Sequence, residues 1–465
     1  MVARKNFCVL ILAGGKGTRM KSDLPKPLQQ ICGKPVLAHI LKASQNLSPS
    51  AIGVLIGHRA ELLKETVQNN LQKWGIKTPV DFALQKELTG SGTAAKYSIP
   101  FIKKFSDVLI LVGDAPLIKS SVLKKLLQKH FSSKAACTVF TVDIENPKGY
   151  GRIIRNSDGV FEKIVEDSQT DAQSAAVKEI NSGMYVFDVQ TLIGTLPELK
   201  PQGPKKEYTL TDIFGLLKQR GRRVEVFKGD DCREAMGVNS KRQLAEAAEI
   251  MRRDINNNLM DAGVNIIDPN STYIDAEVKV GADSVIYPNV FISSRTIIGA
   301  NCVVGPGCWI ENSEISQGTI LKAGCYIIDS KTGKNCQIGP YAHLRPATIL
   351  RDGVKIGNFV ELKKSFIGAG SKVPHLSYVG DSEIGAKVNI GAGSITCNYD
   401  GINKYKTKIN DGVFVGSNTN FIAPVTVGKN AKIGAGSTIT QDIPPSALAI
   451  ARARQVNKSK KETKK

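Results

Sequence analysis

The chain has 465 residues, too many for one ordinary hydrophobic core, so its length favours two domains. Its hydrophobic content is that of a globular protein, and no apolar run approaches the roughly 20 residues of a membrane span. The net charge of +21 leaves +15 once the Lys-rich stretch Arg452–Lys465 is set apart, but no nucleic-acid recognition motif accompanies it and aromatic residues are few. We therefore expect small anionic partners and no nucleic acid.

The first apolar run, Phe7–Ala13, follows Arg4 and Lys5 and faintly resembles a secretory signal peptide. The run is short for that purpose, and Gly14-Gly15-Lys16 stands where a small-residue cleavage site should be. A first β-strand is the better interpretation, and we expect a cytoplasmic protein. The nine cysteines show no CxxC pair or metal-type spacing, so we expect them to be reduced and structural.

Apolar runs of strand length alternate with helical stretches through the first half of the chain. The runs are Phe7–Leu12, Ile52–Ile56, Asp107–Val112, Ala136–Val142 and Gly183–Phe187. This βαβ alternation predicts an α/β, Rossmann-like domain over residues 1–239, with a mostly parallel sheet and helices on both faces.

A glycine-rich turn follows the first expected strand directly, in the sequence LAGGKGTRM. Such a turn brings backbone N–H groups close to a phosphate, and Lys16 and Arg19 add positive charge. A plain strand-to-helix turn would need one glycine rather than three. The turn is neither a P-loop nor a GxGxxG motif. Next comes Lys26, held between two prolines; taken alone it would more often be a surface lysine.

The run Asp107–Val112 predicts a buried strand, and Gly113-Asp114 follows it. In open α/β sheets the ligand crevice lies at the carboxyl ends of the strands, where an Asp can hold Mg²⁺ against phosphate oxygens. A single Asp after a strand is more often a helix cap. The glycine-rich turn in the same domain favours the metal.

Residues 240–260 have helix formers throughout and predict a linker helix. Beyond it, Gly, Val, Ile and Asn become frequent, and aliphatic residues return every sixth position, as in Ile298-Gly299, Val304-Gly305 and Ile310. A period of six fits a parallel β-helix with inward-facing aliphatic residues, here expected over 261–454. The repeat misses at Thr396, and the polar stretch 398–411 reads as an insertion. Residues 455–465 are expected to form a basic disordered tail.

His375 is one of two histidines in the repeat region and lies in the segment HLSYVGD. A neutral imidazole can take the proton from an amine that attacks a thioester. A solitary histidine is more often an ordinary surface or packed residue, so the spacing alone carries little weight.

These motifs carry a resemblance. LAGGKGTRM, SDLPKPL and LVGDAPL look like the motifs of sugar-nucleotide pyrophosphorylases. Together with the hexads and HLSYVGD, residues 7–452 closely resemble the bacterial bifunctional N-acetylglucosamine-1-phosphate uridyltransferase/glucosamine-1-phosphate N-acetyltransferase family. The resemblance implies a nucleotidyltransferase domain followed by a left-handed parallel β-helix that forms a homotrimer, with acetyltransferase sites between subunits.

In the first domain the resemblance implies that Arg19 and Lys26 are catalytic and neutralise the triphosphate of UTP, while Asp114 and Asn239 hold Mg²⁺. The uridine, phosphates and N-acetylglucosamine would contact Leu12, Ala13, Gly14, Gly15, Lys26, Gln85, Gly90, Ser91, Gly151, Glu166, Asn181 and Asn239. Gly14 stands where many members have Ala, and Ser91 where many have Thr; both departures are small.

In the second domain the resemblance makes His375 the general base of acetyl transfer. Glucosamine-1-phosphate would contact Arg345, Lys363, Tyr378 and Asn389. Acetyl-CoA would contact Ala392, Asn398, Tyr399, Ser417, Ala435 and Arg452. Lys404, in the insertion, is expected to meet a phosphate. Pro374 departs from the small or amide residue common before this histidine, and proline fixes the backbone φ directly before His375.

The expected function is acetylation of glucosamine-1-phosphate by acetyl-CoA, then transfer of UMP from UTP to the product, giving UDP-N-acetylglucosamine for peptidoglycan and lipopolysaccharide precursors. One alternative is a nucleotidyltransferase for another sugar or base with a passive β-helix. A second is a basic, non-enzymatic scaffold for nucleic acid, whose binding would fall steeply with salt.

Overall fold

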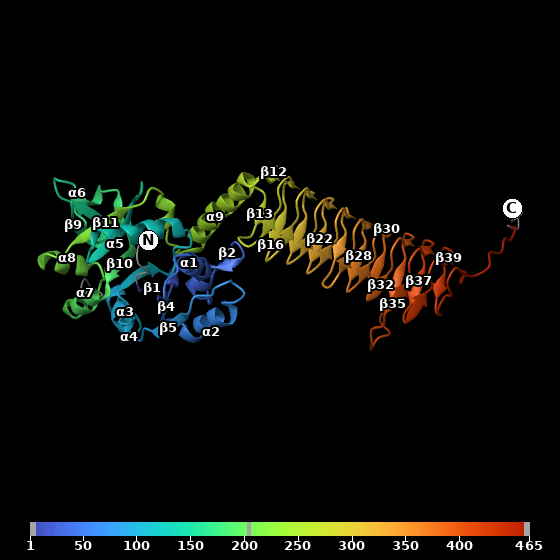
Figure 1. Ribbon diagram of the computed structural model, residues 1–465, viewed down its shortest axis with the longest axis horizontal. Helices are drawn as coiled ribbons and strands as arrows, with labels where there is room; N and C mark the ends of the chain where they lie inside the picture. The colour runs from blue at the N-terminus through green and yellow to red at the C-terminus, as the bar shows by residue number, and fades with distance from the viewer. Residues whose placement is uncertain (1–5, 202–205, 460–465) are drawn as a thin grey trace, which may run out of the picture. The chain divides into compact units, whose positions relative to one another are not determined.

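The computed structural model describes residues 6–201 and 206–459, and the chain divides into two compact units, 1–251 and 252–465. Figure 1 shows an α/β unit and a stack of β-strand coils. Within the described ranges, every helix is too short or too polar to cross a bilayer. Residues 460–465 of the expected basic tail lie outside the described residues, whereas 453–459 are exposed and lie outside any helix or strand.

The first unit is built on a sheet in the order β11-β7-β10-β6-β1-β4-β5. Its strands are β1 (Phe7–Leu12), β4 (Ala51–Ile56), β5 (Val80–Leu84), β6 (Asp107–Val112), β7 (Cys137–Asp143), β10 (Glu179–Asp188) and β11 (Val224–Lys228). Only β10 runs antiparallel to its neighbours along this path. A hairpin of β8 (Arg152–Arg155) and β9 (Phe161–Val165) joins the sheet through β10.

Side chains of β1 alternate between two cores, one on each face of the sheet. Val9 and Ile11 pack with helices α1 (Val36–Gln45), α2 (Ala60–Asn70) and α5 (Ser120–Ser133). Cys8 and Leu10 pack on the other face, where the helices are α3 (Ser91–Tyr97), α4 (Ile99–Ile102), α7 (Val189–Thr195) and α8 (Asp212–Gln219). This confirms the expected α/β fold with helices on both faces. The sequence reading missed β5, β11 and the hairpin, and it found only the second half of β10.

Helix α9 (Lys241–Asp261) covers the stretch expected to be a linker helix. Its first half belongs to the first unit, where Ala247 is buried in the core and Leu244 packs against it. Its second half belongs to the other unit, where Ile255 and Leu259 pack against the core. The boundary between the two units therefore falls inside a helix.

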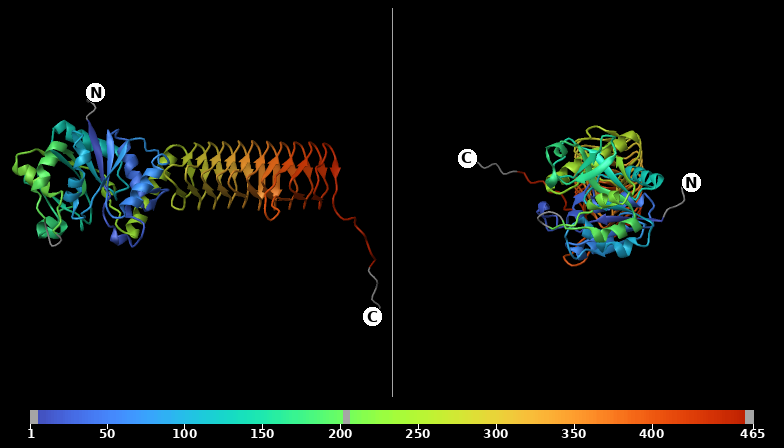
Figure 2. Two further views of the ribbon diagram at one scale, coloured as in Figure 1. Left: turned by 90° about the horizontal axis from the view of Figure 1, so that it is seen from below. Right: turned by 90° about the vertical axis from the view of Figure 1, so that its left-hand side faces the viewer.

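The second unit is a left-handed parallel β-helix, as expected. Over residues 252–459, its strands form three parallel sheets of 11, 10 and 9 strands, running from β12 (Asn265–Ile266) to β41 (Leu448–Ala449). Successive coils are visible edge-on in Figure 2. The inward side chains form one continuous core, in which Ile298, Val304 and Ile310 are at most 1% exposed. The hexads therefore mark the inward positions.

Two details of the repeat differ from expectation. Thr396 does not break it: the residue lies at the inward position of β34 (Ile395–Cys397), paired with Phe421 of the next coil. The stretch after it is also shorter than expected as an insertion, because β35 (Thr407–Ile409) pairs with β32 (Ser382–Ile384) inside a sheet. The loop that protrudes in Figure 1 is thus limited to 398–406.

Candidate functional sites

The glycine-rich turn lies at the carboxyl end of β1, between the ends of β4 and β6. The amide of His58 donates to the carbonyl of Gly14 at 3.0 Å, and the amide of Gly113 donates to the carbonyl of Leu12 at 2.9 Å. A Cβ at Gly57 would lie 2.7 Å from the Gly14 carbonyl oxygen, so only glycine allows this approach. Three strand ends therefore hold the turn, and Gly15 faces open space at its tip.

The expected uracil-binding residues reach the same turn from a different segment. A Cβ at Gly14 would lie 2.9 Å from Oε1 of the buried Gln85, so the turn and this side chain are in direct contact. Gly90 adopts a left-handed φ of 109°, and a Cβ there would lie 2.4 Å from the carbonyl oxygen of Tyr208. Ser91 Oγ accepts the amide of Leu210 at 2.9 Å, so its side chain already has a partner within the protein.

Lys26, Asp114 and Asn239 converge on one point, although they lie far apart in the sequence. The Lys26 ammonium contacts Oδ2 of Asp114 and donates to Oδ1 of Asn239 at 3.1 Å. The amide of Val238 donates to the Asp114 carbonyl at 2.8 Å and holds the two loops together. A carboxylate and an amide oxygen thus face the same cation. Oxygen ligands of this kind suit Mg²⁺, which usually takes one or two protein ligands besides phosphate and water.

The expected sugar-binding residues also form one cluster. A Cβ at Gly151 would lie 3.1 Å from Cγ2 of Ile164, 3.5 Å from Oε2 of Glu166 and 3.6 Å from Cβ of Asn181, so these side chains pack directly around the glycine. The backbone N–H of Asn181 donates to the Gly151 carbonyl at 2.9 Å. Thr211 Oγ1 donates to Glu166 at 2.7 Å and fixes that carboxylate.

The sequence reading missed Tyr208–Thr211, the segment that touches both clusters. Leu210 and Tyr208 bond to the segment around Ser91, and Thr211 bonds to Glu166. It has neither strand alternation nor a glycine-rich turn that could have marked it. Arg19, by contrast, is exposed on a short 3₁₀ helix (Thr18–Met20), and the structure gives it no contact with these clusters.

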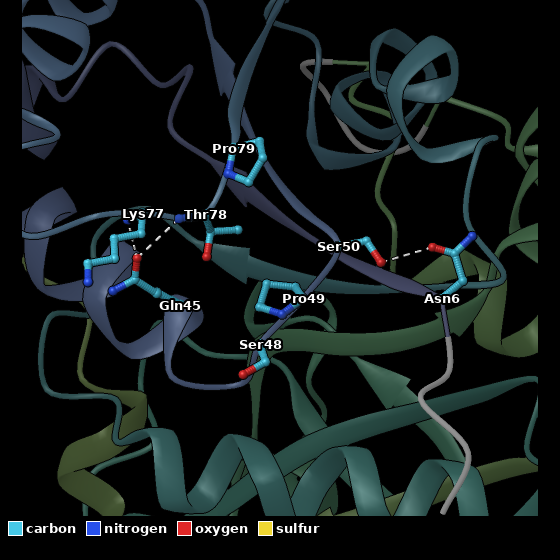
Figure 3. A pocket seen from close by; sticks show the side chains of 8 residues that line it. All are labelled: Asn6, Gln45, Ser48, Pro49, Ser50, Lys77, Thr78 and Pro79. Carbon is cyan, nitrogen blue, oxygen red and sulfur yellow. Dashed lines mark hydrogen bonds between the residues drawn. The ribbon is translucent and has the colours of Figure 1, made fainter.

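A cavity of about 570 Å³ opens at the amino ends of the strands of the same sheet. Figure 3 shows its lining, in which Asn6, Ser50 and Pro79 precede β1, β4 and β5. Gln45 Oε1 accepts the amides of Lys77 and Thr78 there, so its polar groups serve to close the loop. Because it lies at the amino ends of these strands, the cavity is separate from the clusters at their carboxyl ends.

In the β-helix, one edge of the coil stack carries His375 and most of the expected acetyl-CoA residues. His375, Ala392, Ser417 and Ala435 each lie two positions after the inward residue of a strand in the 11-stranded sheet. Hydrogen bonds link the coils along this edge: Gly393 N–H to His375 O at 3.2 Å, Asn418 N–H to Ala392 O at 2.7 Å, and Gly436 N–H to Ser417 O at 2.8 Å. Arg452 Nη1 ends the column on the Ala435 carbonyl at 2.7 Å.

A second edge carries the expected phosphate-binding residues. Arg345 comes directly after β25 (His343–Leu344), and Lys363 is the last residue of β28 (Glu361–Lys363). The two strands are paired, so the residues lie in adjacent coils. Arg345 Nη1 donates to Glu361 at 2.8 Å. The ammonium of Lys404, from the protruding loop, lowers the pKa of Lys363. Desolvation and the charge of Arg345 lower this pKa further. Three cations therefore gather at this edge, where a phosphate dianion would relieve their mutual repulsion.

Tyr378 lies on the sheet face between the two edges, three residues after His375. Asn398 donates to Asp381, which follows β31 (Tyr378–Gly380) on the second edge. Tyr399 is 59% exposed at the base of the loop. Asn389 precedes the His375 edge in β33 (Asn389–Ile390). Tyr378 thus lies on the 10-stranded sheet between the two edges, whereas Asn389 lies on the neighbouring 11-stranded sheet, beside the His375 edge.

Three protein families match parts of the chain. The Nucleotidyl transferase family matches residues 8–233, the GMPPB C-terminal domain matches 268–358, and the Bacterial transferase hexapeptide (six repeats) matches 406–441. The bifunctional protein GlmU of Carboxydothermus hydrogenoformans is 46% identical over 449 residues, which are 97% of this chain and 98% of the relative. That of Clostridioides difficile is 45% identical over 453 residues, 97% of this chain and 96% of the relative. The chain belongs to the bifunctional GlmU family.

Among solved structures, a UDP-glucose pyrophosphorylase complexed with UDP-glucose covers 53% of this chain and 98% of its own at 21% identity, with a TM-score of 0.45. The GlmU relatives, by contrast, extend over both units described above. Membership of the GlmU family therefore covers the glycine turn and the His375 edge alike.

Proposed function

We propose that this member of the GlmU family is a bifunctional enzyme: the β-helix acetylates glucosamine-1-phosphate, and the α/β unit joins N-acetylglucosamine-1-phosphate to UTP. The product is UDP-N-acetylglucosamine, with release of pyrophosphate. The observation that carries this proposal is the presence of two separate charged clusters, Lys26–Asp114–Asn239 in the α/β unit and Arg345–Lys363–Lys404 in the β-helix. His375 lies on the neighbouring edge of the β-helix.

In acetyl transfer, the amine of glucosamine-1-phosphate attacks the thioester carbonyl carbon of acetyl-CoA. The C–N bond forms, the C–S bond breaks and CoA leaves as the thiol. His375 takes the proton that the attacking amine loses, and Arg345 and Lys363 hold the phosphate so that the amine reaches the acetyl group. Ala392, Ser417, Ala435 and Arg452 line the path of the CoA chain, while Tyr378 and Asn389 hold the sugar.

In uridyl transfer, a phosphate oxygen of N-acetylglucosamine-1-phosphate attacks the α-phosphorus of UTP, and pyrophosphate leaves. The step needs little proton transfer, so positioning and charge neutralisation by Lys26 and Arg19 carry it. Gly14, Gln85 and Ser91 lie on the uracil side, and Gly151, Glu166 and Asn181 on the sugar side. Mg²⁺, held by Asp114 and Asn239, would neutralise charge on the triphosphate when bound.

We further propose a cytoplasmic homotrimer in which neighbouring β-helices complete the acetyl-transfer site. Its support is the exposure of the His375 edge, where Tyr341, Phe359 and Leu376 are 56%, 57% and 62% exposed. Large apolar side chains so open to water are typical of a surface that a partner covers. Light scattering should give three times the chain mass, and a monomeric mass at micromolar concentration would contradict this part.

The test of the bifunctional assignment supplies glucosamine-1-phosphate, acetyl-CoA, UTP and Mg²⁺ and follows thiol and pyrophosphate release separately. His375→Ala should abolish thiol release and leave pyrophosphate release from added N-acetylglucosamine-1-phosphate intact. Asp114→Ala should do the reverse. If His375→Ala keeps full thiol release, the assignment of the general base is wrong.

A further inference from the structure

The imidazole of His375 is hydrogen bonded to a side chain of the preceding coil. Its Nδ1 lies 2.6 Å from Oδ1 of Asn358, 17 residues earlier. An amide oxygen carries no hydrogen, so Nδ1 must carry the proton and donate it. In a neutral imidazole with a proton on Nδ1, Nε2 has a free lone pair.

The two strands that carry these residues are longer than their neighbours. The strands β27 (Lys355–Asn358) and β30 (Lys372–His375) have four residues each, and their pairing extends to Asn358 and His375. The other nine strands described in this sheet have two residues each. The sheet is therefore extended at the one rung that brings these side chains together.

The backbone around this rung is tightly constrained. A Cβ at Gly357 would lie 1.7 Å from the carbonyl oxygen of Pro374, so the two coils approach closely only because residue 357 is glycine. The amide of Leu376 donates to the Asn358 carbonyl at 3.1 Å, and Ser377 Oγ donates to the His375 carbonyl at 2.8 Å. Pro374 thus fits the rung, and the carbonyls of both Asn358 and His375 have fixed donors.

We propose that Asn358 is a positioning residue for acetyl transfer: its side-chain oxygen holds His375 in the tautomer whose Nε2 can accept a proton. This inference rests on the proposed function, in which His375 is the general base. The contact with Asn358 also restrains the ring orientation, so the base is ready before substrate binds.

The kinetic test compares Asn358→Leu with Asn358→Asp in the full-length chain. The leucine variant removes the acceptor, and kcat for thiol release should fall about 10- to 100-fold, a part of the roughly 10²–10⁴ that a general base contributes. KM for both substrates should change less than about threefold, because the contacts that bind substrate are intact. The aspartate variant keeps an oxygen acceptor and should recover most of the lost kcat.

Lys355→Gln is the matched control, since Lys355 lies in the same strand and pairs with Lys372 rather than with the histidine. It should leave kcat unchanged, and pyrophosphate release should be normal in every variant. Equal kcat for wild type and Asn358→Leu would overturn the inference. If His375→Ala itself keeps full activity, the proposed function of His375 fails instead, so the two failures are distinguishable.

A second readout is the tautomer itself, measured by ¹⁵N NMR of histidine-labelled protein at a pH where the ring is neutral. With His375→Ala identifying the signal, the wild type should show the proton on Nδ1, and Asn358→Leu should shift the population towards the Nε2-protonated form. A wild-type ring with its proton on Nε2 would overturn the inference even if the kinetics agreed.

Discussion

The hydroxyl of Thr396 accepts a hydrogen bond from the amide of Gly380 at 2.8 Å, although Thr396 occupies an inward position of the β-helix. The same hydroxyl lies 3.2 Å from the Gly380 carbonyl. An aliphatic residue would satisfy the hexad pattern here but could not accept that amide. The polar residue therefore has a structural role in the coil from which the loop 398–406 departs.

Thr396→Val should consequently destabilise the β-helix, even though it improves the hydrophobic repeat. Leaving a buried amide without an acceptor costs about 1–3 kcal/mol, which corresponds to about 2–4 °C in Tm for each kcal/mol in a unit of this size. Differential scanning calorimetry measures it. Thr396→Ser keeps the hydroxyl and should lose only about 1 kcal/mol for the missing methyl. A valine variant at least as stable as wild type would contradict the argument.

Gly151→Ala should weaken binding of N-acetylglucosamine-1-phosphate. The added methyl would lie 3.1 Å from Ile164 Cγ2 and 3.5 Å from the Glu166 carboxylate, so it would crowd the side chains proposed to bind the sugar. A loss of about 1.4 kcal/mol would raise KM for the sugar phosphate about tenfold, with little change for UTP. Gly194→Ala is a control in helix α7 with no atom within 4 Å of the new methyl. Equal KM values for both variants would argue against the sugar site.

Chelation of divalent metal should stop pyrophosphate release and leave thiol release unchanged. The reason is that Asp114 and Asn239 form an oxygen pair in the α/β unit, whereas the proposed acetyl-transfer site uses an imidazole and cations. Parallel assays with EDTA, followed by addition of Mg²⁺ in excess, test this. Thiol release that needs added metal would contradict the proposed chemistry of the β-helix site.

Glu234→Gln should make stability less dependent on pH. This side chain is 3% exposed, and burial raises its pKa from 4.5 to about 7. Its folded state therefore holds a proton that the unfolded state releases, so stability falls as the pH rises from about 4.5 to about 7. The glutamine variant should gain Tm at pH 8 and gain nothing near pH 4. The exposed Glu246→Gln provides the comparison and should show no such difference between the two pH values.

The hexads predicted the inward positions of the β-helix well, because each inward residue is fixed by its own short repeat. Thr396 was misjudged since its hydrogen bond depends on Gly380 of the preceding coil, which periodicity does not reveal. In the α/β unit, the runs over β1 and β6 were found at their observed bounds because both strands are buried on both faces. The edge strand β5 and the hairpin β8–β9 are half exposed, so their apolar signal is weaker.

The candidate sites could be predicted only as far as the motifs reached. Lys26, Asp114 and Asn239 were singled out by resemblance, but the contact among them depends on how three loops meet. Asn358 was not singled out at all, because it lies two positions after the inward Ile356, where the hexad pattern sets no requirement. Its relation to His375 follows from the coil length of 17 residues at that rung, which fixes which side chains become vertical neighbours.

One edge of the β-helix carries a column of residues from successive coils, so the distance along it is set by the number of coils. The column consists of His375, Ala392, Ser417, Ala435 and Arg452. Coils are spaced at about 4.8 Å, so the four steps between the histidine and the arginine measure about 19 Å. Removing one complete coil would shorten the distance between His375 and Arg452 by about 4.8 Å while the hydrophobic core stayed continuous. The length of an extended ligand that fits along this edge is therefore set by the number of coils, which a point substitution does not change.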